Sequence, residues 1–170
     1  MKKTILLLLL LCLSLGCTTL DYRPGVHPLP EKWFHEQPHG QGEVAIINVT
    51  ESETGDILED PGHAVISDKR DWGDDICEMT QDAFRSLGYS VAEMSDKVIQ
   101  IDIDYVHQYP RPFFTSAVCV THVKLGDGTE LTVKTINRSG VSWKRGFYGV
   151  AMKAAYDIAT HPQVVSYLQR

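Results

Sequence analysis

The sequence lacks an excess of basic residues, and this limits the class of partner that it can bind. Its 170 residues contain 16 Lys and Arg against 22 Asp and Glu, so the formal net charge is −6. A nucleic-acid-binding domain normally presents a basic face, and an acidic balance argues against one. The sequence also lacks a repeat of fixed period, which excludes a solenoid. Its length fits one domain.

Catalytic motifs are also scarce. The chain contains no G-x-S-x-G nucleophile elbow and no glycine-rich phosphate-binding loop. Residues 35–39 match the H-E-x-x-H pattern of zinc proteases, in which one helix presents both histidines to the metal. Pro38 interrupts that helix, because proline removes a backbone hydrogen bond and clashes with the preceding turn. We therefore predict no enzymatic activity, no cofactor and no metal site.

No apolar run is long enough to cross a bilayer as a helix. Lys2 and Lys3 precede an apolar run of eleven residues, from Ile5 to Leu15, whereas a membrane-spanning helix needs about 20. A basic start, a short apolar core and small residues at its end are typical of a bacterial secretory signal. We predict that residues 1–16 are a signal peptide.

The run ends at Ser14-Leu15-Gly16-Cys17. This resembles the lipobox of bacterial lipoproteins, in which a small residue precedes the cysteine that receives lipid. Leu and the small residue before Gly16 are exchanged relative to the usual order, so cleavage that releases an unlipidated protein is the alternative. Three acyl chains on Cys17 would anchor the chain permanently, at about 0.8 kcal/mol per buried CH₂. By resemblance to enterobacterial sorting, Thr18 implies the outer membrane, with the protein facing the periplasm.

Cysteine is rare in the remaining chain. Cys12 leaves with the signal peptide, which leaves Cys77 and Cys119 in an oxidising periplasm. A disulfide between them would close a loop of about 43 residues and contribute roughly 4 kcal/mol. We predict this disulfide, and two buried free thiols are the alternative.

A proline-rich stretch follows the lipid site. Residues 17–42 hold four of the eight prolines, and such a composition favours an extended spacer. We therefore expect a lipidated cysteine and linker over 17–42 and a single α+β domain over 43–170. Without Lys2 and Lys3 the mature chain has 14 basic residues against 22 acidic ones and a net charge of about −8.

Hydrophobic periodicity predicts the elements of the domain. Ile99, Ile101, Ile103 and Tyr105 alternate with polar residues, which indicates a strand with one buried face. Asp75 is a suitable cap for a helix that ends before Gly88. The other expected elements are a buried strand at 44–49, an acidic loop at 51–68, a hairpin of 116–125 with 129–137, a short strand at 141–145, and helices at 148–160 and 163–168. Together they predict an antiparallel sheet of four or five strands with two helices packed on one face.

These elements, with residues 84–91 (FRSLGYSV) and 157–165 (DIATHPQVV), resemble the YajG-type small bacterial envelope lipoproteins. The resemblance covers about residues 43–168. It implies a fold and a cellular compartment, and it brings no catalytic motif.

Two surface features are candidates for binding. Half of the acidic residues lie between Glu51 and Asp82, which we interpret as solvated surface, with a docking face for a basic partner as the alternative. Aromatic residues gather around two segments, and core packing is the alternative to a partner or ligand surface. The candidate surface residues are Tyr105, Tyr109, Phe113, Phe114 and Trp143.

The sequence therefore predicts a lipid-anchored envelope lipoprotein that acts as a non-catalytic binding or scaffolding module for other envelope components. The alternative is an auxiliary small-ligand or lipid-binding subunit of a transport system, with a groove lined by Tyr105, Phe113 and Trp143. A third hypothesis assigns a loosely bound metal to His27, His35 and His39.

Overall fold

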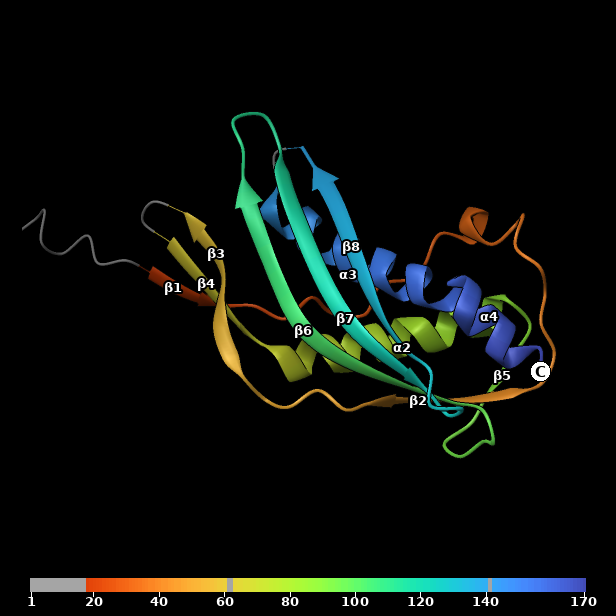
Figure 1. Ribbon diagram of the computed structural model, residues 1–170. Helices are drawn as coiled ribbons and strands as arrows, with labels where there is room; N and C mark the ends of the chain where they lie inside the picture. The colour runs from red at the N-terminus through yellow and green to blue at the C-terminus, as the bar shows by residue number, and fades with distance from the viewer. Residues whose placement is uncertain (1–17, 61–62, 141) are drawn as a thin grey trace, which may run out of the picture.

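The described part of the chain alternates short and long strands with the helices α2, α3 and α4 (Figure 1). A computed structural model describes residues 18–60, 63–140 and 142–170, so the predicted signal peptide and Cys17 lie outside the described residues. None of the helices within these ranges is long and apolar enough to cross a membrane. The elements are β1 (Thr18–Asp21), η1 (Glu31–Trp33), β2 (Glu43–Asn48), β3 (Thr54–Asp60), β4 (His63–Asp68), α2 (Lys69–Ser86), β5 (Ser90–Val91), β6 (Val98–Pro110), β7 (Thr115–Leu125), β8 (Glu130–Ser139), α3 (Trp143–Ala159) and α4 (Pro162–Leu168).

The strands of the described residues form one mixed sheet of eight strands. β6 is its axis: β7 pairs antiparallel along one edge and is followed by β8, while β2 and β3 pair parallel with different parts of the other edge. β4 continues from β3, and β1 pairs parallel with β4. The α+β class is confirmed. The prediction of a purely antiparallel sheet of four or five strands is wrong, because parallel partners come from segments far apart in the chain.

The antiparallel part of the sheet follows the predicted alternation as far as Ile103, since Ile99, Ile101 and Ile103 of β6 are buried. Tyr105, which was predicted on the same buried face, is instead exposed, as is Asp104. The β7–β8 hairpin is confirmed, and Gly128 in its turn has a φ of +86°, which glycine adopts without strain. A bulge between Ile103 and Tyr105 places Asp104 outside the regular pairing.

The acidic loop predicted for 51–68 is instead the β3–β4 hairpin. Its apolar side chains Ile57, Leu58 and Val65 are buried. The acidic residues between them hid this short alternation, since charged residues are depleted in strands.

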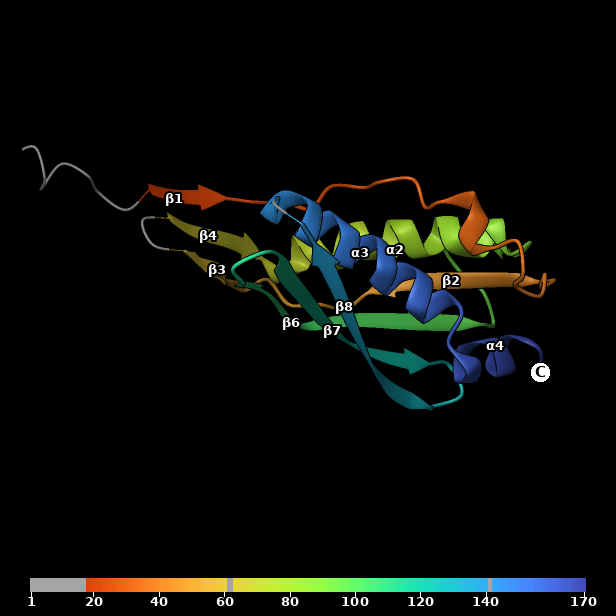
Figure 2. The ribbon, with the colours of Figure 1, turned by 90° about the horizontal axis from the view of Figure 1, so that it is seen from above.

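Both long helices lie on the same face of the sheet (Figure 2). α2 begins six residues earlier than the cap predicted at Asp75, because Asp68 accepts a hydrogen bond from the Arg70 amide at 2.8 Å. It ends as predicted before Gly88, whose φ is +91°. The strand predicted for 141–145 is also wrong: α3 starts at Trp143 and is capped by the Ser142 side chain.

Candidate functional site

The first described residues are part of the sheet, so residues 18–42 are not the spacer that the sequence predicted. Thr18–Asp21 pairs with His63–Ile66. Tyr22 continues this attachment: its amide donates to the Ile66 carbonyl at 3.0 Å, and its own carbonyl accepts from the Ser67 hydroxyl. Trp72 Nε1 in turn donates to Ser67 Oγ at 2.9 Å.

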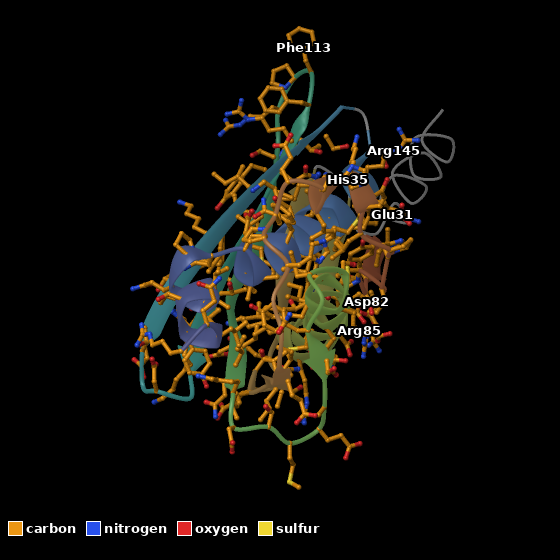
Figure 3. The ribbon with its side chains drawn as sticks, turned by 90° about the vertical axis from the view of Figure 1, so that its right-hand side faces the viewer. Glu31, His35, Asp82, Arg85, Phe113 and Arg145 are labelled. Carbon is orange, nitrogen blue, oxygen red and sulfur yellow. The ribbon has the colours of Figure 1, made fainter. Side chains whose placement is uncertain are left out.

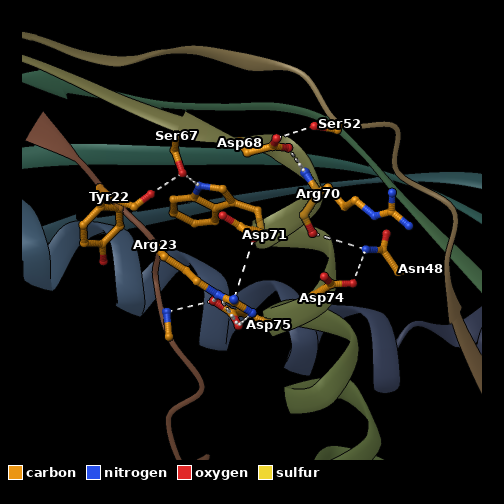
Figure 4. Close-up of polar contacts among 12 residues, drawn as sticks. Tyr22, Arg23, Asn48, Ser52, Ser67, Asp68, Arg70, Asp71, Asp74 and Asp75 are labelled. Carbon is orange, nitrogen blue, oxygen red and sulfur yellow. Dashed lines mark hydrogen bonds and ion pairs between the residues drawn. The ribbon is translucent and has the colours of Figure 1, made fainter. Parts of the chain in front are cut away.

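An ion pair between an exposed arginine and a buried aspartate holds the next residues on α2 (Figure 4). Asp75 is only 2% exposed. Arg23 Nη2 donates to its Oδ1 at 2.8 Å, and the Gly25 amide donates to its Oδ2 at 2.8 Å. The hydrogen bond to Asp75 and, to a smaller extent, the negative charge of Asp75 raise the pKa of Arg23. The residue predicted to cap the helix therefore fastens the N-terminal segment.

The rest of the segment packs over both helices. Phe34 is buried and meets Tyr156 edge-on, with ring centroids 5.6 Å apart. The Gly40 amide donates to Leu87 O at 2.7 Å, and Gly40 lies so close to Tyr89 that a Cβ at this position would fall 1.8 Å from the ring. The predicted linker fails because its prolines direct an extended chain across the helices and do not keep it in solvent.

The histidines of the H-E-x-x-H match lie in irregular chain after η1, where His35 and His39 are exposed. Within residues 18–60, 63–140 and 142–170, no group of three or more His, Cys, Asp or Glu side chains is placed to hold a metal ion. The acidic cluster is used locally instead: Glu53 pairs with Lys69 at 2.6 Å, and Asp68 caps α2.

The face of β6–β8 opposite the helices is not covered by any described element (Figure 2). Cross-strand rows on this face contain Tyr105 with Val120 and Lys134, then His107 with Val118 and Ile136, then Tyr109 with Ser116 and Arg138. Ile136 is 46% exposed and Tyr109 39% exposed. We call this the open face. Ile136 escaped sequence reasoning because β8 alternates only weakly.

Two of the predicted surface aromatics meet on the open face. The hydroxyl groups of Tyr105 and Tyr109 contact each other across His107, which stacks on Tyr105 with a centroid distance of 5.9 Å. Desolvation, together with the hydrogen bond between Tyr105 and Tyr109, raises the pKa of Tyr105 to about 12. Tyr105 therefore stays uncharged at neutral pH and suits contact with an apolar or aromatic surface.

Phe113 and Phe114 lie at the tip of the β6–β7 hairpin. Phe113 is 90% exposed and projects from the end of the molecule (Figure 3). The Arg111 amide donates to the Phe114 carbonyl at 2.9 Å and closes the turn, and the Arg138 guanidinium lies 5.7 Å from the centre of the Phe114 ring.

Trp143 does not belong to this surface. It lies on the helix side, where its ring centroid is 5.4 Å from that of Tyr22 and 5.9 Å from that of Phe147. The groove predicted from Tyr105, Phe113 and Trp143 is therefore wrong, because the sheet separates Tyr105 from Trp143. The space between sheet and helices is filled by fully buried side chains such as Val150 and Ile158.

A shallow hollow of about 400 Å³ lies at the other end of the open face, lined in part by Asp102, His122 and Thr132. His122 Nδ1 is 3.1 Å from Thr132 Oγ1, and Nε2 is 3.7 Å from the Asp104 carboxylate. The acid–histidine–hydroxyl order is that of a nucleophilic triad. The 3.7 Å separation is too long for a hydrogen bond, and all three side chains are exposed to water. This geometry favours a polar contact surface over catalysis.

Cys77 and Cys119 are two separate, buried thiols, so the predicted disulfide is not formed. α2, which carries Cys77, packs on β2 and β6, whereas β7, which carries Cys119, packs against α3. The two cysteines thus belong to different helix–sheet contacts. Burial raises the pKa of each thiol to about 12.

Comparison with known proteins identifies the fold but no family. No protein-family model matches the chain, and no curated protein matches its sequence. Protein XCC0632 from Xanthomonas campestris, described as DUF330, is 15% identical with a TM-score of 0.54 and covers 86% of this chain and 94% of its own.

Two further solved structures are more distant. The PelC dodecamer from Paraburkholderia phytofirmans is 16% identical with a TM-score of 0.35 and covers 85% of this chain and 92% of its own. A neuraminyllactose-binding hemagglutinin homologue from Helicobacter pylori is 10% identical with a TM-score of 0.36 and covers 84% and 97%. Because the TM-scores of these two are below 0.5, the architecture is compared with the Xanthomonas protein alone, whose likeness supports the α+β fold with its large mixed sheet.

Proposed function

We propose that this chain is a lipid-anchored envelope lipoprotein that binds another envelope component through the open face and has no catalytic role. The observation that carries the proposal is the asymmetry of the sheet: one face of β6–β8 is covered by α2 and α3, while the other presents apolar side chains to solvent. Exposed apolar patches rimmed by polar residues mark interaction sites in soluble domains.

Sequence features supply the anchor. The basic, apolar and small regions of residues 1–16 precede Cys17 in the order that secretion and lipidation require. In this proposal the chain belongs with the YajG-type lipoproteins that its elements resemble, and it faces the periplasm from the outer membrane. The absence of the groove predicted between Tyr105, Phe113 and Trp143 favours this scaffolding role over the role of a ligand-binding transport subunit.

The anchor is tested by the intact mass and the membrane fractionation of the native protein beside a Cys17→Ala variant. We expect a mass that includes three acyl chains on Cys17 and loss of membrane association in the variant. An unmodified Cys17 in the soluble fraction would contradict the anchor.

The binding face is tested by crosslinking in cells. Ile136→Asp places a charge in the open face, and Met94→Asp is the matched control, because Met94 is an apolar residue that is 86% exposed elsewhere on the surface. We expect discrete crosslinked complexes that disappear in Ile136→Asp and persist in Met94→Asp. Complexes that persist in both variants would contradict binding through this face.

A further inference from the structure

The beginning of β1 is level with one end of the sheet. Thr18 is in register with His63, and His63 is in register with Asp60 of β3. The start of the described chain, the end of β3 and the beginning of β4 therefore lie at the same end of the sheet. In Figures 1 and 2 this end lies opposite the C-terminus.

The β6–β7 tip lies at the same end of the sheet. Leu58 of β3 pairs with Gln108 of β6, so Asp60 and Pro110, each two residues further on, stand at about the same level. Neighbouring strands are about 4.8 Å apart, which places the end of β6 roughly 15 Å sideways from the start of β1, across β4 and β3. In Figure 1 the two leave the sheet in different directions, β1 beginning at the left and the β6–β7 tip pointing upward, so they occupy neighbouring corners at this end of the sheet.

Cys17 is one residue from Thr18, so an acyl chain on it leaves at most about 3.5 Å of backbone between the bilayer surface and β1. A body held this closely brings into the headgroup layer the segments that project beyond this end of the sheet. The β6–β7 tip projects in this way, because residues 111–114 extend beyond the last paired residues, Pro110 and Thr115.

The chemistry of the tip suits that layer. Phe113 is 90% exposed to solvent. Its turn follows Pro110, contains Pro112 and is closed by the backbone hydrogen bond from Arg111 to Phe114. Basic side chains surround it although the whole chain is acidic: Arg111 in the turn and Arg138 against Phe114. Interfacial membrane contacts combine exposed apolar or aromatic side chains with cations that meet lipid phosphates.

We propose that the β6–β7 tip, residues Pro110–Phe114, is a second membrane contact that inserts Phe113 among the headgroups of the bilayer that holds the anchor, with Arg111 and Arg138 at anionic phosphates. The proposal rests on the proposed function, since it is the anchor that brings this end of the sheet to the bilayer. The contact restricts the tilt of the body, because a second attachment point removes free rotation about a single tether and leaves only rotation about the line that joins the two points.

The test places tryptophan at the tip. Full-length purified Phe113→Trp protein is mixed with vesicles of phosphatidylethanolamine and phosphatidylglycerol that carry bromine-labelled lipid, and the unsubstituted protein supplies the background from its three tryptophans. Met94→Trp is the matched control at the opposite end of β6. We expect a blue shift and quenching for Phe113→Trp and no change for Met94→Trp.

A second variant measures the contribution of the tip without the lipid. In the unacylated Cys17→Ala chain, Phe113→Ser lowers partition into the same vesicles roughly tenfold, as expected when one phenyl group no longer leaves water. Met94→Ser leaves partition unchanged, and vesicles of phosphatidylethanolamine alone bind less than those with phosphatidylglycerol.

Intact mass separates this proposal from the proposed function. A triacylated chain without quenching at residue 113 overturns the tip contact and leaves the anchor in place. A chain without lipid whose residue 113 is nonetheless quenched supports the tip and overturns the anchor. A chain with neither lipid on Cys17 nor quenching at residue 113 overturns the anchor and the tip contact together. If residue 113 becomes shielded from solvent only when a protein partner is added, the membrane contact is overturned.

Discussion

On β6, β7 and β8 the residues that face the helices are almost fully buried, whereas their neighbours on the other face remain in solvent. Ile101 and Cys119 are 0% exposed, while Ile136 is 46% exposed and Tyr105 37% exposed. The covered face supplies the free energy of folding through apolar burial. The apolar residues of the open face contribute little to it, and the proposed function assigns them to contact with a partner.

The largest effect is expected on the covered face. Ile101→Ala removes a side chain that is completely buried beneath the helices. We expect a loss of about 2–5 kcal/mol in the free energy of unfolding, because a cavity adds to the lost transfer free energy. Chemical denaturation measures this value. A loss below about 1 kcal/mol would show that the helices do not cover this part of β6 tightly.

The second prediction tests the layer formed by residues 18–42 over the helices. In Gly40→Ala the new methyl group meets the Tyr89 ring, and overpacking of this kind costs about 1–3 kcal/mol. Gly55→Ala is the control, because nothing lies within 4 Å of a Cβ at that position. Equal melting temperatures for both variants would mean that the segment is a free linker after all.

The third prediction concerns the two buried thiols on the covered side of the sheet. The folded protein keeps Cys77 and Cys119 protonated up to a pKa of about 12, whereas the unfolded chain loses these protons near the ordinary value of 9.0. Stability therefore falls as pH rises above 9, by about 1 kcal/mol per thiol at pH 10. Denaturation of the wild type and of Cys119→Ala over this pH range measures the difference.

Alkylation sharpens the same comparison. Iodoacetamide should leave both native thiols unmodified at pH 8 and should react with a thiol introduced by Ile136→Cys. Rapid modification of native Cys119 would contradict its burial. A mass lower by two hydrogen atoms under oxidising conditions would show that Cys77 and Cys119 form the disulfide after all.

The smallest effect is expected on the open face. Ile136→Ala should change the free energy of unfolding by no more than about 0.5 kcal/mol, as surface substitutions usually do. A loss comparable to that of Ile101→Ala would mean that another part of the chain, or a second copy, covers this face.

The antiparallel half of the fold was predictable because its signals are local. Alternation in Ile99–Tyr105 and the glycines of the β7–β8 turn specify strands and a hairpin without reference to the rest of the chain. β1 and the β3–β4 hairpin were missed because they are short and depend on partners far away. Parallel pairing between Thr18–Asp21 and His63–Ile66 leaves no mark in either segment.

The candidate site divides in the same way. The aromatic residues around Pro110 and Pro112 were recognised from their clustering, and the structure brings Tyr105 and Tyr109 together. Trp143 was grouped with them because sequence position does not reveal which side of a sheet a residue occupies. Arg23 and Asp75 were missed as a pair because 52 residues separate them and because Asp68, Asp71 and Asp74 are equally good capping residues.

The docking of residues 18–42 on the helices also limits how far the folded body can move from the proposed attachment point at Cys17. As an extended tether, 25 residues would span up to about 85 Å and would let the body sample a deep hemisphere of periplasm. Arg23, Phe34 and Gly40 hold these residues on the helices. The segment therefore adds no free chain between residue 17 and the folded body. Under the proposed anchor at Cys17, such a body would meet partners by lateral diffusion in the plane of the membrane, and only those that come within its own height of the lipid surface.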